Sequence, residues 1–275
     1  MKMSAKIDQR STINDQRSTI NDQRYNYVQS LPTIKLNING QTLEYKHGLP
    51  GWIPLKEENA APLFHKTKEL FDRAGIKFAI AFGTLLGAVR EKGVIKSDTD
   101  MDIYIQDEKK LYDNLINFQN EGLFLCRFHP GYGYTFRVDY SGCFIDVYIM
   151  RELRGLRKLL WGRECISLVG FVMPRKLFQG YEKTEFLGEE CLCPANPENL
   201  LEWCYGSDWR IPQDKKGRYE ITPAIYYRKL TSPFVKIARL IFDKNYRIVI
   251  LHRKKTTGSF FFFGPKFKFL RKKQK

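Results

Sequence analysis

The chain has 275 residues, of which 43% are hydrophobic, so it is long and apolar enough for one catalytic domain with appendages. Its net charge of +16 suggests nucleic acid or an anionic membrane as a partner. No segment approaches the roughly 20 apolar residues that a membrane-spanning helix needs, and the first residues do not lead into the apolar run of a signal peptide. We therefore expect a cytoplasmic protein rather than an integral membrane or secreted one.

The first 30 residues carry a seven-residue repeat, Asp8–Asn14, which is copied at residues 15–21 and begun again at residues 22–24. Only one apolar residue recurs in each copy, whereas a coiled-coil seam needs two. A polar segment without an apolar face cannot offset the entropy lost on ordering. We therefore expect residues 1–30 to be disordered.

Two elements are expected between residues 31 and 76. Asn39-Gly40 lies between two strand-like segments and predicts a β-hairpin over residues 34–46. Residues 61–74 place apolar side chains at helical spacing, which predicts a helix. The buried side of this helix should hold Leu63, Phe64, Thr67, Leu70 and Phe71.

A strand, a glycine turn and a helix are predicted next. Residues 77–82 form a short apolar run of strand length, and Gly83-Thr84 then opens a segment of helix-forming residues from Leu85 to Glu91. This arrangement places backbone N–H groups and a hydroxyl at a helix N-terminus, where anions bind. Thr84 is therefore a candidate phosphate contact, and its alternative role is a simple helix N-cap. Arg90 would add a cation from the end of the helix, unless it is an ordinary surface arginine.

Aspartates alternate along the following segment, at Asp98, Asp100 and Asp102, and a fourth, Asp146, lies in a second apolar segment. Side chains of a strand alternate between its faces, so these acids should share one face while apolar neighbours face the core. We expect the strands of Asp102 and Asp146 to be neighbours that present acid to one spot. Crowded carboxylates repel one another, and a cation such as Mg²⁺ or Mn²⁺ bound through oxygen is the usual remedy. The alternative is a solvated acidic loop.

A helix over residues 108–120 is expected to separate these two strands. Residues 134–138 alternate apolar and polar, and Ser141-Gly142 connects them to the strand of Asp146, so the two strands should pair. Arg137 then lies on the face of the acids. There it would meet a donor phosphate or form an ordinary cross-strand ion pair.

Basic residues concentrate at the end of the chain. Residues 231–275 hold 13 Lys and Arg against one acid, whereas residues 31–230 hold 28 against 26. An enzyme that polymerises nucleic acid would line its own groove with cations, so we expect no nucleic-acid partner. Aromatic residues such as Phe260–Phe263 interleave with the basic ones, and together they favour an anionic membrane surface on the cytosolic side. The alternatives are a disordered soluble tail and an RNA-binding tail.

The motifs resemble those of the LicD family, which includes phosphorylcholine transferases of bacterial surface glycans and is related to the fukutin-related protein group. The matching stretches are Gly83–Arg90, Gly93–Ile95 and Asp98–Asp102. A second stretch, Pro197–Trp209 followed by Pro212, is similar to the closing Tyr-Gly-x-x-Trp-x-x-Pro segment of the family. Together these stretches frame roughly residues 60 to 215.

The resemblance implies an α/β (α+β) fold, with a nucleotidyltransferase-like mixed β-sheet flanked by helices over residues 31–230. It also implies metal-dependent transfer of phosphocholine, or a similar phospho-alcohol, from CDP-choline or a related CDP-alcohol. The acceptor would be a sugar hydroxyl of a cell-surface glycan, a lipid-linked sugar or a lipopolysaccharide precursor. The catalytic and metal-binding residues expected are Asp100, Asp102 and Asp146. The residues expected to contact substrate are Gly83, Thr84, Arg90, Asp98, Arg137, Tyr205 and Trp209.

Several roles stay open at this point. Asp146 would either bind the metal or take the proton of the acceptor. Tyr205 and Trp209 would form an aromatic wall for a base or a choline head, and core packing is the alternative for Trp209. A polyol-phosphate transferase, another nucleotidyltransferase and a non-catalytic binding protein are the alternative functions.

Overall fold

The structure is a computed structural model of the chain, which divides into two units, Met1–Arg228 and Lys229–Lys275. All described residues belong to the first unit. The predicted tail from residue 231 and the repeats before residue 20 lie outside the described residues, so both remain predictions. The structure describes residues 20, 22–49, 53–129, 133–153, 158, 162, 164–168 and 171–212.

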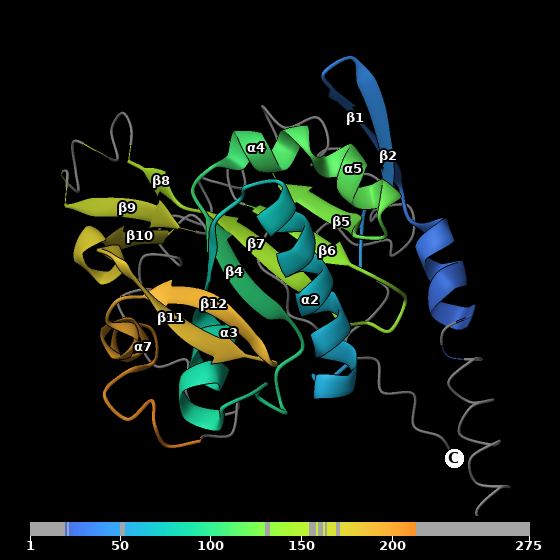
Figure 1. The fold of residues 1–275 in the computed structure, drawn as a ribbon. Helices are drawn as coiled ribbons and strands as arrows, with labels where there is room; N and C mark the ends of the chain where they lie inside the picture. The colour runs from blue at the N-terminus through green and yellow to red at the C-terminus, as the bar shows by residue number, and fades with distance from the viewer. Residues whose placement is uncertain are drawn as a thin grey trace, which may run out of the picture. The chain divides into compact units, whose positions relative to one another are not determined.

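A seven-stranded mixed sheet forms the centre of the fold, as Figure 1 shows. Its strand order is β11-β12-β3-β4-β7-β6-β5. The pairs β12–β3 and β4–β7 are parallel, and the other neighbours are antiparallel. The predicted mixed sheet flanked by helices is therefore confirmed. The strands are β3 (Phe78–Ile80), β4 (Met101–Ile105), β5 (Phe124–His129), β6 (Gly133–Arg137), β7 (Ile145–Ile149), β11 (Tyr181–Phe186) and β12 (Glu189–Pro194).

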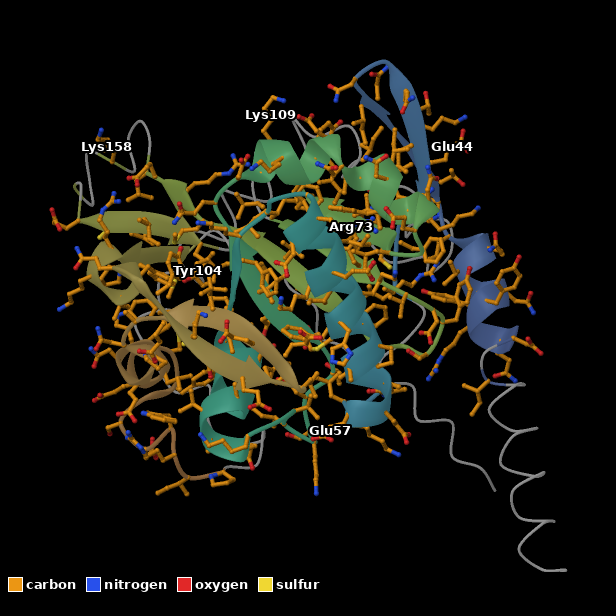
Figure 2. The ribbon with its side chains drawn as sticks, viewed as in Figure 1. Glu44, Glu57, Arg73, Tyr104, Lys109 and Lys158 are labelled. Atoms are coloured by element: carbon orange, nitrogen blue, oxygen red, sulfur yellow. The ribbon has the colours of Figure 1, made fainter. Side chains whose placement is uncertain are left out.

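Helix α2 (Glu57–Arg73) packs its apolar side on the sheet, and Figure 2 shows Glu57 and Arg73 at its opposite ends. The Phe71 ring meets the rings of Phe78 in β3 and Phe136 in β6. All five side chains predicted for the buried side are buried. The helix begins four residues before the predicted start, because the Asn59 side chain accepts the backbone N–H of Lys56 and ends the preceding segment there.

The predicted helix over residues 108–120 is present as two short helices, α4 (Glu108–Asp113) and α5 (Leu115–Asn120). They are separated at Asn114, whose side-chain amide donates to the Lys110 carbonyl. A side chain that bonds to nearby backbone in this way competes with regular helix geometry. Local hydrogen bonding therefore explains the break.

The predicted hairpin is confirmed as β1 (Thr33–Ile38) paired antiparallel with β2 (Gln41–Lys46). Asn39 and Gly40 have φ of 52° and 86°, as the tight turn between twisted strands requires. Figure 2 labels Glu44 on this hairpin.

A second, three-stranded sheet was not anticipated. It contains β8 (Arg151–Glu152), β9 (Cys165–Leu168) and β10 (Phe171–Pro174). Two helical elements lie later in the chain, η2 (Arg175–Phe178) and α7 (Pro197–Tyr205).

Residues 22–30 are helical, so the prediction of disorder is wrong for this part of the N-terminal segment. The reason is contact with distant residues that the repeat pattern does not reveal. The Arg24 guanidinium donates to the Ser141 carbonyl, the Tyr25 ring packs edge-on against Tyr140, and Val28 is buried.

None of the helices in the described part of the chain combines the length and the apolar character needed to cross a bilayer.

Candidate active site

The turn after β3 leads directly into the helix pair α3 (Phe82–Leu86) and η1 (Gly87–Glu91). The turn was expected at Gly83-Thr84 with the helix opening at Leu85, but the helix begins at Phe82. Phe82 has a φ of 42°, a left-handed conformation that is rare for a bulky side chain and that clusters at functional sites. Phe82, rather than a glycine, therefore supplies the change of direction.

Gly83 is required here for close approach rather than for an unusual φ. A Cβ at this position would lie 2.3 Å from Oδ2 of Asp98 and 3.4 Å from Oδ2 of Asp102. The Gly83 N–H donates to Oδ2 of Asp102 at 3.2 Å. The missing side chain thus lets the first turn of α3 touch two of the acids.

Parallel pairing of β4 and β7 places Asp102 opposite Asp146 in register. This confirms that the two acid-bearing strands are neighbours. The strand begins only at Met101, so Asp98 and Asp100 lie in the loop before it and do not alternate along the strand as expected. The backbone N–H of Leu55 donates to the Asp98 carbonyl at 2.8 Å, and this long-range bond is compatible with a loop rather than a longer strand.

The carboxylates of Asp100, Asp102 and Asp146 each offer one oxygen atom, and these atoms lie within 4.8 Å of one another. Such a cluster could hold a metal ion, and an all-oxygen donor set suits a hard cation such as Mg²⁺ or Mn²⁺. The three residues that the sequence assigned to the metal are therefore brought together. Asp98 lies beside this group, against Gly83.

Hydrogen bonds from the surrounding elements hold these acids. The Thr84 hydroxyl accepts the backbone N–H of Asp102 at 2.6 Å, and this hydrogen bond connects α3 to β4. Thr84 is only 4% exposed, so the bond is buried. Tyr148, on the same face of β7 as Asp146, lies with its hydroxyl 3.0 Å from Oδ1 of Asp102 and 3.4 Å from Oδ2 of Asp146. A phosphate contact by Thr84 stays a prediction.

The electrostatics of the cluster disfavour charge. Burial raises the pKa of Asp102 well above its ordinary value, and the charges of Asp100, Asp146 and Asp98 raise it further. Burial and the adjacent acids also raise the pKa of Tyr148, so its hydroxyl stays protonated and acts as a donor at neutral pH. A bound cation would relieve the repulsion among these carboxylates.

The arginine that pairs with the cluster is Arg127 on β5, which the sequence did not single out. Its Nη2 lies 3.5 Å from Oδ1 of Asp146. Arg137 is instead buried, with its guanidinium over the rings of Phe124 and Tyr140 and a hydrogen bond to the Asp139 carbonyl. A phosphate contact by Arg137 stays a prediction.

The C-terminal residues expected near substrate lie around α7, which packs against α3. Arg90 donates to the Trp209 carbonyl at 3.0 Å and pairs with Glu91. Trp209 is 3% exposed, and the guanidinium of Arg210 lies 4.2 Å from the centre of its ring. These contacts favour core packing for Trp209, whereas Tyr205 is half-buried at the end of α7.

The site thus consists of clustered carboxylates on and beside two adjacent strands, next to a strand–turn–helix unit. Residues 75–196 match the family model described as LicD/FKTN/FKRP, nucleotidyltransferase domain. This part of the chain therefore matches the LicD family, as the motifs from Gly83 to Asp102 indicated. The closing motif at residues 197–212 lies outside the matched range and stays a prediction.

Two relatives of known sequence share part of this chain. An uncharacterized protein of Rickettsia prowazekii (strain Madrid E) is 36% identical over 93 residues, which cover 33% of this chain and 32% of that protein. An uncharacterized protein of Rickettsia typhi (strain ATCC VR-144 / Wilmington) is 41% identical over 61 residues, which cover 21% of this chain and 20% of that protein. The chain thus spans about a third of the length of the first relative and a fifth of the second.

Similar solved structures include an antibiotic-resistance factor and an antibiotic adenylyltransferase. The solution structure of the antibiotic-resistance factor ANT(2'')-Ia has 17% identity and a TM-score of 0.38, over 71% of this chain and 97% of that one. The lincomycin-bound lincosamide antibiotic adenylyltransferase LnuA has 11% identity and a TM-score of 0.36, over 52% of this chain and 85% of that one.

Replacing Gly83 with alanine should disturb the site more than the fold. The new Cβ would displace the flexible carboxylate of Asp98, whereas alanine is favoured over glycine within a helix by roughly 0.5–1 kcal/mol. We expect the free energy of unfolding, measured in urea, to change by less than about 1 kcal/mol. Metal-dependent turnover should fall about tenfold or more, because small misplacements at a reacting centre cost up to about 100-fold.

Gly122→Ala is a matched control with the opposite signature. Gly122 has a φ of 88° and nothing within 4 Å of its added Cβ. Alanine there should lower stability by about 1–2 kcal/mol through backbone strain and leave turnover unchanged. Full turnover in Gly83→Ala would contradict the close-approach argument.

Asp102→Asn should stabilise the metal-free protein. The raised pKa of Asp102 means that the folded state disfavours the ionised form, so the charge destabilises the fold at neutral pH. An asparagine can still accept the Gly83 N–H and face Tyr148. We expect the melting temperature in EDTA to rise by about 2–4 °C, which corresponds to about 1 kcal/mol. Added Mg²⁺ should raise the melting temperature of the wild type and not of the variant. If Mg²⁺ raised the melting temperature of the variant as much as that of the wild type, Asp102 would not be a ligand of the ion.

Proposed function

We propose that this protein transfers phosphocholine, or a similar phospho-alcohol, from a CDP-linked donor to a sugar hydroxyl of a cell-surface glycan or lipopolysaccharide precursor. The observation that carries the proposal is the in-register pairing of Asp102 with Asp146, with Asp100 beside them, inside a domain of the LicD family. Transfer of a phosphoryl group depends on positioning and charge neutralisation more than on covalent chemistry by the protein. The site supports that kind of chemistry.

Asp100, Asp102 and Asp146 would hold Mg²⁺ or Mn²⁺, and the bound ion supplies positive charge to the donor diphosphate. Gly83 keeps the first turn of α3 against the acids, so phosphates held beside them would meet this backbone. Asp98 and Thr84 are proposed to line the same side. Tyr148 keeps its proton and orients Asp102.

The half-buried Tyr205 is proposed to contact the transferred group. Arg90 donates a hydrogen bond to the carbonyl of Trp209. We propose that this contact supports the substrate pocket without touching the substrate. Arg137 is engaged with aromatic rings and backbone. A direct substrate contact by any of these residues remains a proposal.

A different donor on the same site is the second candidate, such as a polyol phosphate or a nucleotide transferred to another acceptor. The site chemistry is common to both, and the choice of donor separates them. A non-catalytic binding protein would have no need of all three acids in one cluster. Their presence supports an enzyme.

We further propose that residues 231–275 hold the enzyme on the cytosolic face of an anionic membrane, where lipid-linked acceptors are available. The composition of this segment, 13 basic residues and one acid together with Phe260–Phe263, supports the proposal. Basic residues near an anionic surface contribute about 1 kcal/mol each.

The reaction is tested by incubating the full chain with Mg²⁺ and a panel of CDP-linked alcohols and measuring CMP release. We expect release from one donor, loss in EDTA and a fall of about 100-fold or more in Asp100→Ala, because metal-bound charge stabilisation is worth several kcal/mol. Lys109→Ala is the control, since that side chain is 85% exposed and lies on α4 at the surface (Figure 2). No CMP release from any donor, even with glycan acceptors present, would refute the CDP-alcohol proposal.

Membrane attachment is tested by co-sedimentation with vesicles that contain anionic lipid, compared with purely zwitterionic vesicles. Replacing Arg271, Lys272, Lys273 and Lys275 with glutamine should weaken binding to anionic vesicles by more than about tenfold, since each contributes about 1 kcal/mol near the surface. High salt should weaken wild-type binding in the same way. Equal sedimentation with both kinds of vesicle, or preferential binding to RNA, would contradict the proposal.

A further inference from the structure

Arg127 reaches the acid cluster because β5 contains an irregularity. Leu125 pairs with Phe136 of β6, but the next pair is Arg127 with Thr135, so Cys126 is an extra residue in β5. In regular pairing Cys126 would lie opposite Thr135, and Arg127 would point to the other face of the sheet. A β-bulge of this kind re-aims a side chain, and bulges are common beside active sites.

The bulge completes a row of polar side chains across four strands. Arg127 on β5 pairs with Thr135 on β6, Thr135 pairs with Asp146 on β7, and Asp146 pairs with Asp102 on β4. Directly opposed side chains in neighbouring strands are close enough to interact. The row therefore joins a cation, a hydroxyl and two carboxylates on one face of the sheet.

Two donors in this row converge on a single oxygen of Asp146. The Thr135 hydroxyl donates to Oδ1 of Asp146, and Nη2 of Arg127 lies 3.5 Å from the same atom. Nε of Arg127 also donates to the Thr135 hydroxyl at 3.3 Å, which orients the hydroxyl hydrogen towards the carboxylate. Oδ1 of Asp146 is thus engaged on the side away from Asp102.

The other oxygen of Asp146 faces the cluster. The Tyr148 hydroxyl lies within hydrogen-bond distance of both Oδ2 of Asp146 and Oδ1 of Asp102. These two carboxylate oxygens therefore lie on the same side of the cluster. Asp146 and Arg127 are mostly buried, with side chains 14% and 27% exposed. Their geometry is therefore protected from competing water.

From this geometry we infer that Arg127 and Thr135 are positioning residues, which hold Asp146 by Oδ1 so that it gives the metal one oxygen, Oδ2. The inference rests on the proposed metal-dependent function and adds how Asp146 is held, which favours its role as a ligand of the ion over that of proton acceptor. Residues that orient a metal ligand typically change metal affinity by about 10- to 100-fold when they are removed.

Charge and positioning predict opposite effects. Arg127 is a cation beside a cation site, so if its charge alone mattered, removing it would strengthen metal binding. If Arg127 and Thr135 position Asp146, removing either one weakens metal binding. Substitution of Thr135 changes no charge and therefore isolates the positioning effect.

The test is Mn²⁺ binding to the full chain, followed by electron paramagnetic resonance of the free ion. Thr135→Val keeps the side-chain shape and removes the hydroxyl, and we expect its Mn²⁺ dissociation constant to rise about tenfold or more. Thr135→Ser restores the hydroxyl and should bind Mn²⁺ like the wild type. Thermal unfolding of both variants checks that the fold is retained.

Arg127→Lys provides the second arm, because it keeps the charge but lacks the planar fork that reaches Thr135 and Asp146 together. We expect a similar loss of Mn²⁺ affinity, and little further loss when Thr135→Val is added, since both act through one oxygen. Arg73→Gln is the matched control, because Arg73 pairs with Glu121 at the surface, where its side chain is 54% exposed. Its Mn²⁺ affinity should equal that of the wild type.

The outcomes separate the inference from the proposed function. If the wild type binds Mn²⁺ and Thr135→Val binds it equally well, the positioning role is refuted while the metal site stands. If Arg127→Gln binds Mn²⁺ more tightly and Arg127→Lys is unchanged, Arg127 acts only through charge and the inference is overturned. A wild type that binds no Mn²⁺ refutes the metal site itself, and the inference falls with it.

Discussion

Repulsion between carboxylates that parallel strand pairing forces together is the constraint on which this site depends. The register of β4 and β7 sets Asp102 beside Asp146, and burial makes the negative charge of Asp102 more costly. Neighbouring groups partly compensate: the Gly83 N–H and the Tyr148 hydroxyl bond to Asp102, and Arg127 pairs with Asp146. What remains is a cluster whose repulsion a divalent cation would relieve. The energetic cost of bringing these acids together would thus favour the binding of a cation.

The backbone next to the acids is also held in costly conformations. Phe82 adopts a left-handed φ, and η1 continues α3 with the wider π-type turns that often mark functional sites. The same turns bring Gly87 against the Gly93 carbonyl, where a Cβ would lie 2.4 Å from the oxygen. The glycines of the motif are therefore explained by close packing around the site. A pattern of glycines that suggests phosphate binding also serves to bring backbone and carboxylate together.

Four arginines of the described domain show that the sequence position of an arginine does not predict which groups its side chain contacts. Arg127 meets the acids, Arg137 stacks on aromatic rings, Arg90 holds the Trp209 carbonyl, and Arg210 covers the Trp209 ring. Each arginine satisfies carbonyls, rings or carboxylates that the fold has already buried. These four arginines therefore make packing and pairing contacts within the described domain, whereas most of the excess positive charge of the chain lies in residues 231–275.

Short-range periodicity was sufficient to predict the features that depend on neighbours in the chain: the Asn39-Gly40 hairpin, the apolar side of α2, and the two acid-bearing strands with their buried apolar rows. The spacing of the acids likewise predicted the three carboxylates that meet, and the resemblance of the motifs to the LicD family agrees with the family match over residues 75–196. Only the tertiary structure decided the rest. Arg127 faces the acids because of a bulge that exists only in the pairing of β5 with β6, and residues 22–30 are ordered by contacts with Tyr140 and Ser141. Such contacts join residues more than 100 positions apart, in the case of Arg24, and no local pattern encodes them.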